Sequence, residues 1–118
     1  MNEQFTLKNI IKLSSKVTVY VPSTMNISEN IDNTKYVDEC ATLLANCFGG
    51  ATSTKTLGYW TSPKEGLVKE ETTMVFAYCT TEQAEKHMDK VYRFCLKLKE
   101  ELKQDAVALE YNGEMFLL

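Results

Sequence analysis

The sequence predicts a small α+β domain in which two helices pack on one antiparallel sheet. Three observations indicate this class. Segments 37–48 and 84–102 repeat apolar residues at the spacing of an amphipathic helix. Segment 72–79 is a strand by composition and is apolar on both of its alternating faces. The dipeptide at 112–113, Asn-Gly, lies between two apolar runs and is the strongest short signal for a β-hairpin.

Composition places the chain among ordinary globular proteins. Its 118 residues, 44% hydrophobic and 25% charged, predict one domain at 16–118 behind an N-terminal extension at 1–15. A net charge of −3 argues against a broad nucleic-acid surface. No apolar run approaches the roughly 20 residues of a membrane helix, and residues 1–15 lack the basic region, apolar stretch and small-residue cleavage site typical of a leader peptide. We therefore expect a cytoplasmic protein that binds neither membranes nor nucleic acid.

The first half of the domain predicts a strand and a helix. Segment 16–21 alternates polar and apolar residues and stops at Pro22. Asp32 or Asn33 can cap the helix that follows, and the glycines at 49–50 end it. The apolar face of this helix consists of Val37, Cys40, Ala41, Leu44, Cys47 and Phe48.

A hairpin is predicted next, with strands at 51–60 and 67–79 joined by the turn-rich loop 62–66. Gly58 indicates a bulge or a close backbone approach in the first of these strands. A second helix starts at a capping box formed by Thr80 and Gln83. Its buried stripe is predicted to contain Ala84, Met88, Val91, Cys95, Leu98 and Leu102. Strands at 106–111 and 114–118 complete the chain.

This order is βαββαβ plus a terminal strand, the split βαβ arrangement of ferredoxin-like folds. Right-handed crossovers put both helices on one sheet face and leave the other face open. The period of the strand at 72–79 leaves two alternatives for its open side. We favour the larger side chains, because small residues allow close packing under the helices, although a bulge would reverse the assignment. The larger set is Met74, Phe76 and Tyr78, and the smaller set is Val75, Ala77 and Cys79.

The cysteines and the single histidine predict no metal site. Cys40, Cys47, Cys79 and Cys95 have no CxxC spacing and only His87 to join them. We expect them to be small buried hydrophobes in a reducing compartment. No glycine-rich loop has a phosphate-binding pattern, so no cofactor is predicted.

Four short motifs resemble a family of small bacterial proteins known as a domain of unknown function. The resemblance covers about residues 16–111, and the chain departs from the pattern at Glu71, where proline is more usual. It implies a ferredoxin-like fold, relatives in Gram-positive bacteria and their phages or mobile elements, and no activity. The motifs are Phe-Gly-Gly-Ala-Thr at 48–52, Gly-Tyr-Trp at 58–60, Leu-Val-Lys-Glu at 67–70 and Gln-Asp-Ala-Val at 104–107.

The hypothesis favoured by the sequence is a non-catalytic binding protein that forms a homodimer through the open sheet face and can bind another protein. With a mobile-element origin, it would inhibit a host defence system, as an anti-CRISPR protein does. Aromatic and large apolar side chains are the anchors that interfaces favour. The predicted interface residues are Tyr20, Tyr59, Trp60, Met74, Phe76, Tyr78, Tyr92 and Leu96.

The alternative is a cofactor-free small enzyme or small-ligand binder of the ferredoxin-like dimer type. Its acid-base candidates are His87, Glu70 and Glu110. A histidine on the flank of a helix is more often a half-buried surface residue, and the acids at 70–71 suit a solvated strand edge. We therefore assign no catalytic residue from the sequence.

Overall fold

The computed structural model describes residues 10–118, so positions 1–9 of the predicted N-terminal extension lie outside the described residues. Two helices and seven strands follow one another along the chain. They are β1 (Ser15–Pro22), β2 (Thr24–Met25), β3 (Glu29–Asn30), α1 (Thr34–Phe48), β4 (Thr52–Ser62), β5 (Gly66–Cys79), α2 (Thr81–Glu101), β6 (Ala108–Tyr111) and β7 (Glu114–Leu117).

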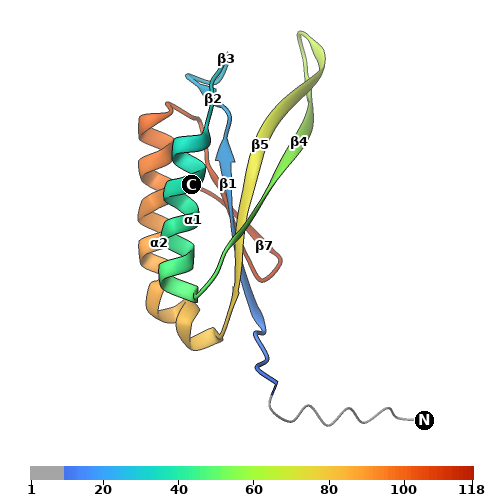
Figure 1. Cartoon of the computed structure of the whole chain (residues 1–118). Coiled ribbons are helices and arrows are strands. Elements are labelled where there is room, and N and C mark those ends of the chain that lie inside the picture. The colour runs from blue at the N-terminus through green and yellow to red at the C-terminus, as the bar shows by residue number, and fades with distance from the viewer. Residues whose placement is uncertain (1–9) are drawn as a thin grey trace, which may run out of the picture.

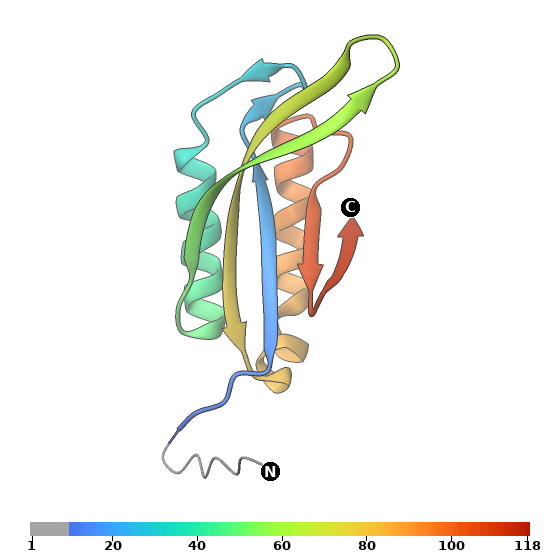
Figure 2. The ribbon, with the colours of Figure 1, turned by 90° about the vertical axis from the view of Figure 1, so that its right-hand side faces the viewer.

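Five strands form one sheet in the order β4-β5-β1-β6-β7, and each neighbouring pair is antiparallel. Both helices lie on the same side of this sheet (Figure 1). The other face is open and is turned to the viewer in Figure 2, with the helices behind it. The predicted class, a small α+β domain with an antiparallel sheet and two helices, is confirmed.

The alternation along β5 decides which of its faces the helices cover. Val75 and Cys79 are fully buried in the core, whereas Tyr78 is 51% exposed. Met74 and Phe76 are half-buried on the open face. The prediction that the larger side chains lie on the open face is thus confirmed, because the β-branched and small residues of β1 and β5 fill the space under the helices.

Local sequence sets the ends of both helices. The N-cap of α1 is Asn33, one of the two predicted residues, but its side chain makes no capping hydrogen bond. The Asp32 carboxylate before it accepts from the Thr34 backbone N–H at 3.0 Å, and Gly49 ends α1 as predicted, with a φ of 92°. At the start of α2, the Thr80 hydroxyl and the Gln83 side chain exchange hydrogen bonds with each other's backbone. Among the described residues, neither helix has the length and apolar character needed to cross a membrane.

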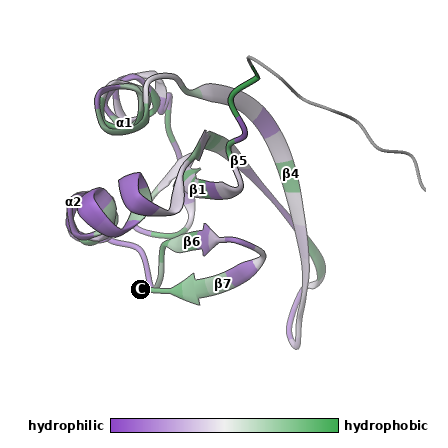
Figure 3. Ribbon diagram, turned by 90° about the horizontal axis from the view of Figure 1, so that it is seen from below, coloured by the Kyte–Doolittle hydropathy of each residue, from purple (hydrophilic) through white to green (hydrophobic). Residues whose placement is uncertain are grey.

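The predicted stripes of both helices enter the core. Met88, Val37 and Ala41 lie at its partly buried margin. Figure 3 shows α1 and α2 together on one side of β1 and β5. The fully packed members are Cys40, Leu44, Cys47 and Phe48 of α1, with Ala84, Val91, Cys95, Leu98 and Leu102 of the α2 segment.

The strands differ from the prediction at two places. Gly58 forms no bulge, because β4 and β5 stay in register from end to end and Gly58 pairs with Glu70. The alternative, a close backbone approach, is only an ordinary contact, since a Cβ at Gly58 would lie 3.6 Å from the Glu70 carbonyl oxygen. The short pair β2 and β3 was not predicted. It is held against the end of α2, where the Gln104 side-chain amide donates to the carbonyls of Thr24 and Leu102 at 2.9 Å.

The long β4–β5 hairpin extends beyond the helices and twists across the end of β1 (Figures 1 and 2). Strong twist is usual in a two-stranded ribbon. The twist brings residues 70–72 of β5 beside Tyr20 and the segment that leads into β6. Residues that are far apart in the sequence therefore meet at this end of the sheet.

Candidate functional site

Two hydrogen bonds join acids to aromatic side chains on the open face, towards the β4–β5 hairpin; we call this part the open end of the sheet. The Tyr20 hydroxyl donates to Glu110 Oε1 at 2.9 Å. The Trp60 indole N–H donates to Glu70 Oε1 at 2.9 Å. Partial burial, followed by the bond and the charge of Glu110, raises the pKa of Tyr20 above its ordinary value. The tyrosine is therefore a stable donor at neutral pH, and both carboxylates have fixed positions.

A cavity of about 130 Å³ lies beside these pairs, and we call it the Tyr20 cavity. Glu70 and Gln104 give it an acidic and an amide wall. Carboxylate and amide oxygens at one place are suited to a cationic ligand group. Its lining residues are Tyr20, Pro22, Ser23, Thr24, Glu70, Glu71, Thr72, Gln104, Ala106, Val107 and Ala108.

A second cavity, of about 200 Å³, has three lining residues in common with the first, and we call it the Lys55 cavity. The two share Ser23, Glu71 and Thr72. The Lys55 cavity has charged side chains of both signs and several hydroxyl groups. It is lined by Ser23, Ile31, Asp32, Asn33, Thr34, Lys55, Thr56, Glu71, Thr72 and Thr73.

At the end of the open face away from the Tyr20 cavity, the side chain of Lys16 lies over two aromatic rings. Lys16 Nζ lies 4.5 Å from the centre of the Phe76 ring and 5.4 Å from that of Tyr78. The two rings meet edge to face at 6.2 Å. This end of the sheet offers stacking surfaces, whereas the Tyr20 end offers acids.

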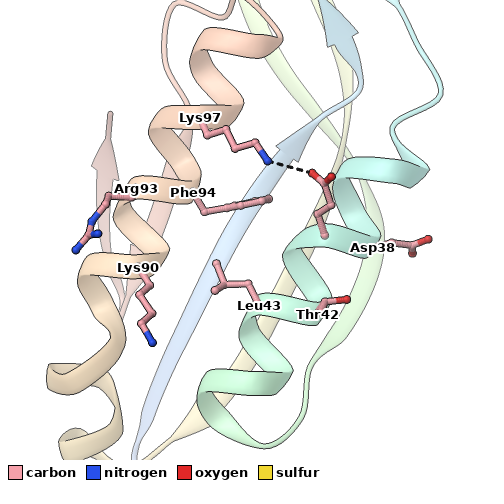
Figure 4. A pocket seen from close by; sticks show the side chains of 8 residues that line it. Asp38, Thr42, Leu43, Lys90, Arg93, Phe94 and Lys97 are labelled. Carbon is pink, nitrogen blue, oxygen red and sulfur yellow. Dashed lines mark ion pairs between the residues drawn. The ribbon is translucent and has the colours of Figure 1, made fainter.

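A wider groove of about 620 Å³ runs between α1 and α2 on the outer side of the helices. Leu43 and Phe94 point into it, and Lys97 reaches across it to Glu39 (Figure 4). Lys97 Nζ lies 3.7 Å from Glu39 Oε1 and 3.8 Å from Glu101 Oε2. Because this lysine is already paired with acids of the chain, we do not place the candidate site in the groove.

The predicted interface residues do not form one surface. Tyr20 and Trp60 lie on the open face with the large residues of β5, since β4 and β5 pair Thr52 with Phe76 and Trp60 with Val68. Tyr59 alternates to the other side of β4. Tyr92 and Leu96 are exposed on α2 in the helix layer. Their role in binding a partner stays a prediction.

The three acid-base candidates are also divided. Glu70 and Glu110 lie at the open end of the sheet, each bound by an aromatic donor. His87 lies on α2, with its ring 6.0 Å from that of Phe48. Its Nδ1 is buried and has no partner among residues 10–118. The structure thus brings the two acids near Tyr20 and leaves the histidine in the helix layer.

The cysteines are free thiols buried in the core. Burial raises the pKa of each, that of Cys95 to about 12. In the part of the chain that the structure describes, no three His, Cys, Asp or Glu side chains cluster as metal ligands would. We find no chemical role for these thiols in the site.

The sequence matches no protein-family model and no curated protein. The structure is similar to a phage SAM lyase in complex with S-methyl-5′-thioadenosine, with a TM-score of 0.65 and 15% identity over 97% of this chain and 95% of that chain. An apo phage SAM lyase gives a TM-score of 0.64 with 17% identity over 89% and 88%. A Bacillus cereus protein related to NIF3 gives 0.49 with 15% identity and is covered over only 25% of its length, too loose a match to carry an argument.

These comparisons correct the favoured hypothesis. The prediction of a non-catalytic inhibitor of the anti-CRISPR type is wrong, because the solved structures that match nearly the whole chain are those of an enzyme. The alternative, a small enzyme or small-ligand binder, fits the match better. The homodimer and the resemblance to a bacterial family stay predictions.

Proposed function

We propose that this protein is a small enzyme that cleaves S-adenosylmethionine (SAM) and releases S-methyl-5′-thioadenosine. The observation that carries the proposal is the acidic Tyr20 cavity, on a fold that phage SAM lyase matches over nearly its whole length. We also propose the ferredoxin-like arrangement for this chain. The order β4-β5-β1-β6 around two crossover helices supports it.

The chemistry of the substrate suits the acids of the site. SAM contains a sulfonium cation, an ammonium group and a carboxylate, so its reacting centre is positively charged. Glu70 faces the Tyr20 cavity, and Glu110 is held next to it by Tyr20. Fixed carboxylates stabilise a cation most where water is partly excluded. We assign Glu70 to the sulfonium and its neighbouring carbons.

The reaction breaks the bond between the sulfonium sulfur and the γ-carbon of the amino-acid part. The electron pair of that bond passes to sulfur, which becomes the neutral thioether of S-methyl-5′-thioadenosine. The γ-carbon regains its electron pair in one of two ways. Either the substrate's own carboxylate closes a lactone ring on it, or a base removes the neighbouring β-proton and a double bond forms. In the second route, we assign the role of the base to Glu70, which lines the cavity.

The adenosine half is larger than the Tyr20 cavity, so we place it on the neighbouring open face. Met74 is half-buried there and lies in register with the aromatic Tyr20. A thioether and an aromatic ring provide an apolar surface for a purine, and aromatic stacking tolerates many bases.

The test is incubation of the purified protein with SAM and quantification of S-methyl-5′-thioadenosine by mass spectrometry. We expect product well above a protein-free control, because SAM also decays without protein. Glu70→Gln should lower the rate about a hundredfold, the cost typical of losing one preorganised electrostatic contact. Glu65→Gln is the matched control, since Glu65 is exposed at the turn of the same hairpin.

The co-product identifies the route, because a lactone and an unsaturated amino acid differ in mass and in reaction with hydroxylamine. Absence of product above the protein-free control from pH 6 to pH 9 would refute the proposed function. A Glu70→Gln rate equal to that of the Glu65→Gln control would refute the placement of the site.

A further inference from the structure

We propose that the Lys55 cavity binds the zwitterionic amino-acid end of the substrate, with Lys55 at the carboxylate and Glu71 and Asp32 at the ammonium group. The choice of ligand rests on the proposed function. The charges and the ordered walls of the cavity themselves favour a zwitterion.

Charges of opposite sign face this cavity without forming an ion pair with one another. Lys55 pairs with Thr73 and Leu57 pairs with Glu71, so Lys55 and Glu71 lie on the same side of adjacent strands. Within residues 10–118, the ion pairs are Arg93–Asp89, Lys97–Glu39 and Lys97–Glu101, and none of them uses the charges of this cavity. A ligand with one charge of each sign would give both Lys55 and Glu71 a partner of opposite charge.

Asp32 adds a second carboxylate from the loop before α1. Its pKa is lowered, first by the hydrogen bonds that Thr34 donates and to a lesser degree by the charge of Lys55. The carboxylate is therefore ionised at neutral pH. Because Asp32 and Glu71 would repel a phosphate, and Lys55 would repel a metal ion, the mixed charge favours a zwitterion over either.

The walls of the cavity are held in place before any ligand binds. The Asn33 side-chain amide lies 3.1 Å from the Ser23 hydroxyl and 3.2 Å from that of Thr73. On the opposite face of the hairpin, the hydroxyls of Thr56 and Thr72 are 2.7 Å apart and hold β4 to β5 behind the cavity. Walls that are already ordered lower the entropy lost on binding, and their hydroxyls can donate to or accept from the head group.

Size and position agree with one end of a larger substrate. The cavity of about 200 Å³ is below the range of roughly 300–1,000 Å³ that is usual for complete small-molecule sites. Ser23, Glu71 and Thr72 line both this cavity and the Tyr20 cavity, and Glu71 follows Glu70 in β5. A head group in the Lys55 cavity would leave the sulfonium beside Glu70.

The first experiment measures binding with probes that need no turnover. L-Methionine and 3-(methylthio)propylamine, which lacks the carboxylate, are titrated into the protein by NMR. We expect L-methionine to bind about tenfold more tightly, the effect of one charge-assisted hydrogen bond. Lys55→Gln should abolish this difference, and Lys64→Gln, at the turn of the same hairpin, should retain it.

The second experiment measures cleavage of SAM with decarboxylated SAM added as a competitor, a design that holds for both the lactone and the elimination route. In the wild-type protein and Lys64→Gln, the KM of SAM should lie well below the inhibition constant of decarboxylated SAM. In Lys55→Gln the two constants should become similar, while the inhibition constant of decarboxylated SAM is retained. Equal behaviour of Lys55→Gln and Lys64→Gln in both experiments would refute the head-group site. L-Methionine binding that depends on Lys55, without any cleavage of SAM, would support this site and refute the proposed function alone.

Discussion

The Tyr20 hydroxyl donates a hydrogen bond of 2.9 Å to Glu110, and this bond joins β1 to β6 on the open face of the sheet. Tyr20 also lines the cavity that contains Glu70. The raised pKa of Tyr20 keeps its proton on oxygen across the neutral range, so the bond persists wherever the enzyme would work. Tyr20 thereby holds Glu110 next to the cavity that Glu70 lines.

Tyr20→Phe should lower SAM cleavage about tenfold, because loss of a hydrogen bond to a charged group costs roughly 1.5–3 kcal/mol. As a positioning residue, Tyr20 acts on the reaction through Glu110, so the loss should appear in kcat while the KM of SAM changes little. The measurement is kcat and KM at pH 7.5.

Tyr111→Phe is the matched control for this change. Tyr111 lies on the same strand as Glu110 but packs at the margin of the core. If both variants cleave SAM with the same kcat and the same KM, Tyr20 has no positioning role.

Asn33→Asp should destabilise the fold more than Asn33→Ala. The Asn33 amide nitrogen lies 3.2 Å from the Pro22 carbonyl and within hydrogen-bond distance of the hydroxyls of Ser23 and Thr73. Alanine removes these bonds, at a cost of about 1–3 kcal/mol for the groups left unpaired. Aspartate also places a negative charge against the carbonyl oxygen.

Urea denaturation of the wild type and both variants measures this order. Variants as stable as the wild type would show that the amide does not hold the start of α1 to the ends of β1 and β5, and equal losses in the two variants would contradict the effect of the aspartate charge. Asp38→Asn, an exposed change on α1, serves as a control for altered charge.

Leu98→Ala and Leu96→Ala form a matched pair two residues apart on α2. Leu98 is 1% exposed and Leu96 is 38% exposed. Leu98→Ala should lower the free energy of unfolding by about 2–5 kcal/mol through loss of burial and the cavity left behind. Leu96→Ala should cost less than about 1 kcal/mol. Thermal and urea unfolding check both values, and similar losses would contradict the assigned faces of α2.

The helices and their faces could be predicted because each depends on residues close together in the sequence. The stripe that includes Leu98 follows from a 3.6-residue period, and the start of α2 follows from Thr80 and Gln83 alone. The open side of β5 was also predictable. Val75 and Cys79 fit under helices that Phe76 would hold away.

The candidate site could not be predicted in the same way. It depends on the twist of the β4–β5 hairpin and on the unpredicted pair β2 and β3, which together bring Lys55 near Asp32 and Gln104 near Glu70. No short-range pattern marks these positions. Lys55 occurs in a threonine-rich strand, and Gln104 occurs in a polar connection, where such residues are ordinary.

The buried thiols predict a loss of stability at alkaline pH. Each cysteine has a raised pKa in the folded protein, chiefly through burial, against an ordinary value of 9.0. A raised pKa in the fold means that the contribution to stability is complete below pH 9 and is lost as the pH rises, because the unfolded thiols ionise first. The loss is on the order of 1 kcal/mol for each deeply buried thiol per pH unit above that point.

Cys95→Ala isolates this contribution, since Cys95 is fully buried and its pKa is raised to about 12. The variant should be less stable at pH 7.5, because it leaves a small cavity. Between pH 9 and pH 11, however, its free energy of unfolding should fall less steeply than that of the wild type. Tyrosines and lysines titrate in both proteins and cancel in the comparison. Parallel curves from urea denaturation would mean that the Cys95 thiol ionises as easily in the fold as in the unfolded chain, contrary to its place between the helices and the sheet.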